Sequence, residues 1–126
     1  LKNAEWATYA AEYLAKGVMP ILLLGWYPDY IDPDDYLTPF LHSEYSGSLG
    51  VFYSNPEMDA TLEEAMVKVD IKERTKLYEK VQRLMADEAP VVPFFQGRLN
   101  AVTWPYIKGF ILDPTMLLRY YLIYRE

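Results

Sequence analysis

At 126 residues, of which 52% are hydrophobic and 24% charged, the chain has room for one domain and too much apolar material for disorder. Its net charge of −6 argues against a nucleic-acid partner, because contact with phosphates requires a dense basic surface. The lack of cysteine excludes a disulfide scaffold, a thiolate metal site and a cysteine nucleophile.

The chain opens with a predicted helix and a predicted strand. Aromatic and apolar residues recur at helical spacing between Asn3, a candidate N-cap, and Gly17, a candidate stop, which predicts a helix over residues 4–16. The apolar run at residues 18–26 is shorter than the roughly 20 residues of a membrane span, and Pro20 interrupts it. The run is typical of a strand buried on both faces, so helix and strand together indicate an α/β lobe.

Residues 27–55 are predicted to form a long irregular loop with one short helical turn around residues 34–41. Such a long loop is uncommon in a compact domain unless it has a function. Its aspartates do not have the spacing of an EF-hand calcium loop, and nothing holds two of them at the separation of a glycosidase pair. Capping of free backbone amides is the preferred interpretation for Asp32, Asp34 and Asp35.

Two amphipathic helices are predicted next. Asn55 and Pro56 begin the first, Asp70 and Glu73 form a capping box at the start of the second, and Pro90 ends it. The apolar stripes comprise Met58, Leu62, Ala65, Met66 and Val69 in the first helix, and Leu77, Val81, Leu84 and Met85 in the second.

The tail is predicted to contain extended segments. Residues 91–96 are expected to form a strand at a sheet edge or a crossover, because Pro93 cannot donate to a ladder. A last aromatic strand is expected near residues 119–124.

Asp29 differs from the other acids of the loop in its position. It comes three residues after Trp26, just beyond the predicted strand, and ligands of open α/β sheets gather outside the carboxyl ends of strands. A carboxylate there can pair with a ligand ammonium group while Trp26 supplies a flat apolar wall. The 12 tyrosines suit a wet binding cleft, although most of the rings are expected in the core.

Catalytic patterns are missing from the sequence. His42 is the only histidine, no Gly-x-Ser-x-Gly elbow accompanies it, and no glycine-rich phosphate cradle occurs. We therefore predict that His42 lies on a loop surface, that no cofactor is bound, and that the chain is not an enzyme.

The segment at residues 25–33, which reads GWYPDYIDP, resembles the "GW..DY.DP" signature of family 5 extracellular solute-binding proteins of ABC importers. Further similarities follow in the same order at residues 53–59, 70–74, 77–78, 87–93 and 108–109. The resemblance covers essentially the whole chain. It implies an α/β fold that is the C-terminal portion of a two-lobed, type II periplasmic-binding-protein-like receptor.

The same resemblance assigns lobes and site residues. Residues 1–93 would belong to the second lobe, and residues 94–126 would cross back to complete the first. In peptide-binding members the acid at the position of Asp29 salt-bridges the peptide's amino terminus, and the residues at Trp26 and Tyr27 line the cleft. Tyr30 is a further candidate contact, whereas the Asp-Pro pair at residues 32–33 is structural.

The function implied is capture of dipeptides or oligopeptides outside the membrane, by hinge closure and without catalysis, for delivery to ABC permease subunits. Three alternatives stay open: an oligosaccharide receptor that stacks sugars on Trp26, Tyr27 and Tyr30, a hydrolase that uses the loop carboxylates, and an interaction module that binds no small solute. The location implied is the periplasm or the extracellular face of the membrane, with a lipid anchor as one means of attachment. The chain shows no signal peptide and does not begin with Met, so we expect a fragment whose export signal lies upstream.

Overall fold

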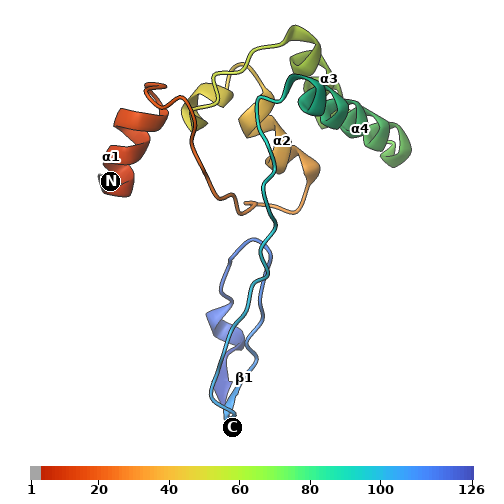
Figure 1. The fold of residues 1–126 in the computed structure, drawn as a ribbon. Coiled ribbons are helices and arrows are strands. Elements are labelled where there is room, and N and C mark those ends of the chain that lie inside the picture. Colours follow the sequence, from red (N-terminus) through yellow and green to blue (C-terminus); the bar gives the residue numbers. More distant parts are fainter. Residues whose placement is uncertain (1–3) are drawn as a thin grey trace.

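The structure, a computed structural model, describes residues 4–126, so the expected cap at Asn3 lies outside the described residues. Helices α2, α3 and α4 group together, while the N-terminal helix and a long C-terminal arm, residues 91–126, extend away from them (Figure 1). The elements in chain order are α1 (Trp6–Thr8), η1 (Tyr9–Leu14), α2 (Pro33–Leu41), η2 (Ser46–Leu49), α3 (Pro56–Val67), α4 (Ile71–Glu88), β1 (Ile107–Lys108), η3 (Tyr120–Leu122) and β2 (Tyr124–Arg125).

One apolar cluster holds α2, α3 and α4 together. Its side chains come from all three helices and are removed from water, which is the main favourable term in folding. The buried members are Leu41, Met58, Leu62, Ala65, Tyr78 and Val81. The predicted stripes are thus confirmed in their centres, whereas Met66 and Val69 at the end of the first stripe are exposed.

The three helices begin at the predicted caps. Asp32 accepts from the backbone N–H of Asp34 at 2.9 Å, and Asn55 and Asp70 cap α3 and α4 in the same way. Asp32 and Asp70 each satisfy one of the backbone donors that a helix start leaves free, and Asn55 satisfies two. After α4, Ala89 adopts a left-handed conformation at φ 50°, and Pro90 follows as the predicted stop.

The N-terminal helix is confirmed over residues 6–14 as a single helical segment whose last six residues, Tyr9–Leu14, have the wider π geometry. Leu14 is buried and Gly17 ends the segment at φ +60°. A Cβ atom at Gly17 would lie 2.7 Å from the ring of Phe52, so this close approach and the left-handed conformation both favour glycine.

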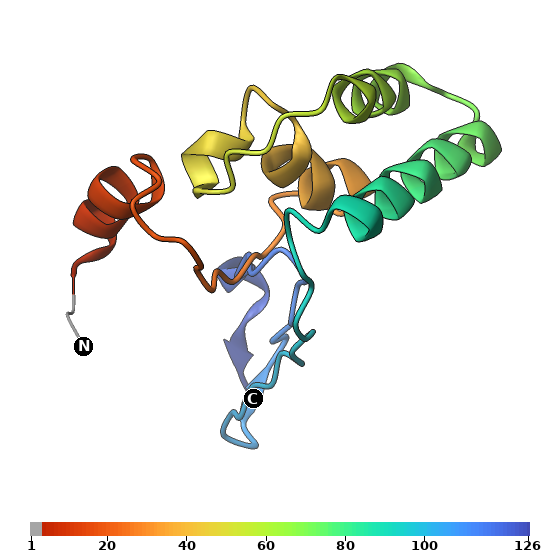
Figure 2. The same ribbon diagram turned by 45° about the horizontal axis from the view of Figure 1, so that its top comes forward.

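The prediction of a strand at residues 18–26 is wrong. The segment is a connection without ladder partners, and Ile21 and Leu23 are 89% and 75% exposed. Strand formation depends on neighbouring strands, and within residues 4–126 the sheet consists of β1 and β2 alone. Figure 2 shows this connection running between the N-terminal helix and the α2–α4 group.

The predictions for the tail also fail in detail. Residues 91–96 are not a strand, and Phe94 and Phe95 are more than three-quarters exposed. Near residues 119–124 the chain forms the short helical turn η3, and β2 follows it. Strands β1 and β2 pair antiparallel, with Ile107 opposite Arg125, near the far end of the arm (Figure 1). The chain thus holds the helices of an α/β domain with only a small piece of sheet.

Candidate functional site

The four candidate residues Trp26, Tyr27, Asp29 and Tyr30 lie on the segment that leads into α2, which we call the entry segment, residues 26–30. This segment has no helix or strand of its own. Its position therefore depends on contacts with α2, and the structure provides a separate contact for Trp26, for Asp29 and for Tyr30.

Both the indole N–H and the aromatic ring of Trp26 make contacts that hold this side chain in place. The indole N–H donates a 2.9 Å hydrogen bond to the backbone carbonyl of Asp35. The ring meets Phe40 edge to face, with centroids 5.0 Å apart, which is a favoured aromatic geometry. Trp26 is consequently half-buried and fixed in orientation, while the next residue, Tyr27, is 57% exposed.

The main chain of Asp29 is held by a hydrogen bond, whereas its side chain remains exposed to solvent. Its backbone N–H donates to Oδ2 of Asp35 at 2.8 Å, and Asp35 itself is only 5% exposed. The Asp29 carboxyl group is exposed and has no hydrogen-bond partner among residues 4–126. Because the predicted strand does not form here, Asp29 lies on the surface of the described chain and not at a strand end.

Tyr30 is tied to the first turn of α2. Its hydroxyl donates to Oδ2 of Asp34 at 2.5 Å, and this hydrogen bond raises the pKa of Tyr30 above its usual range. The hydroxyl is therefore already engaged, while 49% of the residue remains exposed.

Asp32 connects the entry segment to α4. Its carboxyl group caps α2 and also accepts two hydrogen bonds of 2.7 Å from the guanidinium of Arg74. Arg74 in turn donates to the backbone carbonyl of Ala65 at 2.9 Å and lies over the ring of Tyr78. The structural role expected for Asp32 is seen directly, and hydrogen bonds from Arg74 hold the pKa of this carboxyl group below its usual range.

Sequence reasoning missed the roles of Asp35 and Arg74. The sequence predicts that Asp35 caps free amides near the helix start, and it does bind an amide, but the amide belongs to Asp29, six residues upstream. Arg74 lies in one of the segments that resemble the solute-binding family, yet no periodic pattern links it to Asp32, 42 residues earlier. Long-range pairs of this kind carry no local signal.

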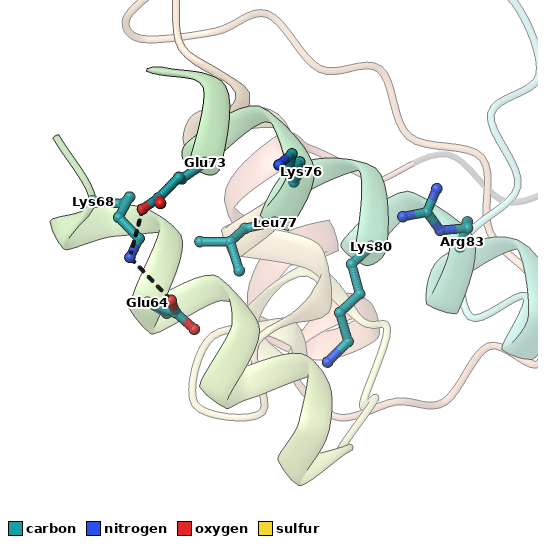
Figure 3. A pocket seen from close by; sticks show the side chains of 7 residues that line it. All are labelled: Glu64, Lys68, Glu73, Lys76, Leu77, Lys80 and Arg83. Atoms are coloured by element: carbon teal, nitrogen blue, oxygen red, sulfur yellow. Dashed lines mark ion pairs between the residues drawn. The ribbon is translucent and has the colours of Figure 1, made fainter. Parts of the chain in front are cut away.

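A groove between α3 and α4 is lined by four basic side chains, those of Lys68, Lys76, Lys80 and Arg83, and Figure 3 shows them. Lys68 lies between Glu64 and Glu73, at 3.4 Å and 3.1 Å, and Lys80 pairs with Glu57 at 2.7 Å. Acids thus offset much of the positive charge, and the arrangement is that of a solvated helix pair. The entry segment does not contribute to this groove.

The prediction of a surface position for His42 is wrong. His42 is 8% exposed, its Nδ1 accepts from the backbone N–H of Glu44 at 3.2 Å, and its ring lies against Tyr45. The nearby Ser43 binds Asp59 instead of the histidine, so the two do not form a nucleophile–base pair.

Over residues 4–126, His, Asp and Glu side chains form no group of three able to hold a metal ion. In the same range, every helix is too short or too polar to span a bilayer.

Comparison with known proteins finds no matching family model but several related sequences. Heme-binding protein A of Haemophilus influenzae is 33% identical over 111 residues, which cover 87% of this chain and 20% of the relative. The periplasmic murein peptide-binding protein MppA of Escherichia coli is 30% identical over 113 residues, which cover 90% and 20%. The chain thus spans about a fifth of the length of these relatives.

A solved structure matches as well. The unliganded open form of the periplasmic murein tripeptide-binding protein MppA superposes with a TM-score of 0.72 at 28% sequence identity. The match covers 99% of this chain and 24% of the MppA chain. The shared fold therefore includes the α2–α4 group, the entry segment and the C-terminal arm.

Proposed function

Because this chain belongs to the family of periplasmic peptide-binding proteins that its relatives represent, the family 5 solute-binding proteins, we propose that it is part of a receptor that captures peptides for import. The observation that carries the proposal is the superposition with the tripeptide-binding protein over 99% of the chain. The entry segment supports it, because one carboxyl group there is free to meet a ligand while the main chain around it is held.

The ligand contacts we propose are Asp29, Trp26 and Tyr27, with Tyr30 as a further contact. The open carboxyl group of Asp29 would pair with the peptide's ammonium group, and the oriented indole of Trp26 would flank it. The exposed ring of Tyr27 would lie along the peptide backbone.

The lobe assignment is part of the proposal. Residues 1–93 would belong to the second lobe and residues 94–126 would return to the first. The course of the chain supports this, because the arm leaves the α2–α4 group soon after α4 ends (Figure 1). The arm also exposes large apolar side chains, among them Phe94, Phe95 and Trp104, which a lobe would cover.

The mechanism proposed is binding without bond chemistry. A ligand that contacts both lobes stabilises the closed arrangement in proportion to its differential affinity for that state. The partners would be ABC permease subunits, and in support an Escherichia coli relative is named a probable ABC transporter periplasmic-binding protein. The location would be the periplasm or the outer face of the membrane, where a lipid anchor is one means of attachment.

The test is calorimetry of the full-length receptor with a free and an amino-terminally acetylated peptide. We expect Asp29→Ala to weaken binding of the free peptide by about 2–5 kcal/mol, because it leaves a buried ammonium group unpaired. The acetylated peptide has no ammonium group, so the same substitution should change its binding by less than about 1 kcal/mol. Asp87→Ala, which removes an exposed acid from the end of α4, serves as the control.

The class of ligand needs a test of its own. One relative is named for haem binding, and an oligosaccharide receptor is an alternative that the sequence leaves open. A thermal-shift screen of the full-length protein against peptides, oligosaccharides and haem should show stabilisation by peptides. Stabilisation by oligosaccharides or haem alone would overturn the peptide assignment. Turnover of a chromogenic glycoside that is lost in Asp29→Asn would overturn the non-catalytic mechanism.

A further inference from the structure

Helix α2 contains a proline four residues after Asp35. In a regular helix the backbone carbonyl of residue 35 would accept from the N–H of residue 39, but Pro39 has no N–H. The carbonyl of Asp35 therefore lacks its helical partner. The indole N–H of Trp26 donates a hydrogen bond to this carbonyl instead, at 2.9 Å.

The side chain of Asp35 is also used in an unusual way. Asp32 is the N-cap, so Asp35 occupies the third helical position, where an acidic side chain commonly reaches back to the N-cap N–H. Here the N–H of Asp32 instead donates to the carbonyl of Tyr30 at 3.0 Å. The carboxyl group of Asp35 reaches further back and accepts from the N–H of Asp29 at 2.8 Å.

We propose that Asp35 is a positioning residue of the ligand site: its carbonyl, freed by Pro39, orients the Trp26 ring, and its carboxyl group fixes the main chain that presents Asp29. The inference rests on the proposed function, since it assigns a role in ligand binding to a residue that is 5% exposed and out of reach of a ligand. Its physical basis is preorganisation. A segment without helix or strand loses conformational freedom on binding, and the two hydrogen bonds remove much of that loss in advance.

The variants separate positioning from folding. Asp35→Ala removes the acceptor for the N–H of Asp29, whereas Asp35→Asn retains a side-chain oxygen at the same place. Asp59→Ala is the matched structural control, because Asp59 also accepts a backbone N–H, that of Ser43 just beyond the other end of α2, at 2.9 Å. Pro39→Ala restores a competing helical N–H while favouring the helix, so it should fold.

In calorimetry of the full-length receptor with a free peptide, we expect at least fivefold weaker binding for Asp35→Ala. Asp35→Asn and Asp59→Ala should bind within about threefold of wild type. Pro39→Ala should bind at least about threefold more weakly while its melting temperature is unchanged or higher, an outcome that a purely structural role does not produce. Hydrogen exchange of the backbone amides of Tyr27, Asp29 and Tyr30 should accelerate in Asp35→Ala and not in Asp59→Ala.

The outcomes distinguish the two proposals. If wild-type receptor binds no peptide, the proposed function fails whatever the variants do. If wild type binds and Asp35→Ala binds equally well, the positioning role fails and the proposed function stands. Should Asp35→Ala not fold, Pro39→Ala decides: wild-type affinity there would overturn the role of the Asp35 carbonyl. Equal weakening in Asp35→Ala and Asp59→Ala would show a structural effect and would also overturn the inference.

Discussion

Arg74 and Asp32 are 42 residues apart in the sequence, yet two hydrogen bonds of 2.7 Å join their side chains. Each side chain is about a quarter exposed, so the pair is partly shielded from water. The planar guanidinium matches both carboxylate oxygens, a geometry that lysine cannot reproduce. At the scale of single residues, this pair fixes the start of α2, and with it the entry segment, against α4.

The pair makes stability depend on pH. Because Arg74 lowers the pKa of Asp32 in the folded state, the stabilisation is complete above the unfolded carboxyl pKa of about 4 and is lost as pH falls through the lower folded value. At pH 7 we expect Asp32→Asn to lower the free energy of unfolding by about 1–3 kcal/mol, since Asn still caps α2 but pairs poorly with Arg74. Urea unfolding should show this difference shrinking below about pH 4, and a constant difference would contradict the assignment.

At the scale of elements, α2, α3 and α4 are stabilised by one face of each helix. On α3 the contrast is sharp, because Leu62 is fully buried while Val67 is 78% exposed. Apolar burial contributes roughly 25 cal/mol per Å², and an emptied core position loses packing contacts as well.

This contrast predicts the effect of two truncations on the same helix. Leu62→Ala should lower the free energy of unfolding by about 2–5 kcal/mol, because it leaves a cavity among the residues of the α2–α4 cluster. Val67→Ala is the control and should change it by less than about 0.5 kcal/mol. Equal losses in urea unfolding would mean that Leu62 is not part of a packed core.

At the scale of the whole molecule, most of the exposed apolar surface lies outside the α2–α4 cluster. The residues concerned lie in the 18–26 connection and in the C-terminal arm, and include Ile21, Leu23, Phe94, Phe95 and Trp104. Large contiguous apolar surfaces are rare on free monomers and favour association. The chain spans about a fifth of its relatives, so the rest of the receptor is the cover we propose for these surfaces.

We therefore expect the isolated 126-residue chain to associate at micromolar concentration in sedimentation velocity, whereas the full-length receptor should not. Replacing both Phe94 and Phe95 by serine should shift the isolated chain toward monomer, because each ring is more than three-quarters exposed. Val67→Ser, an equally exposed apolar site on α3, is the control. Association that persists unchanged in the Phe94/Phe95 variant would show that these two side chains of the arm do not mediate the association.

Much of the helical structure could be predicted because its signals are local. Asn55 and Asp70 bind backbone amides two or three residues ahead, and the stripes need only the 3.6-residue period. The strands could not be predicted in the same way, because a strand forms only where a neighbour offers its ladder. Within residues 4–126 the 18–26 segment meets no such neighbour, so its apolar composition was misleading.

For the candidate site, the sequence alone determined which residues form the entry segment: the GW..DY.DP likeness located Trp26, Tyr27, Asp29 and Tyr30. Only the tertiary structure decided how that segment is held, through Asp35, Pro39 and the Asp32–Arg74 pair. The physical reason is the range of the interactions. Caps and helix periods act over a few residues and can be read along the chain, whereas hydrogen bonds between distant segments exist only after the backbone has brought them together.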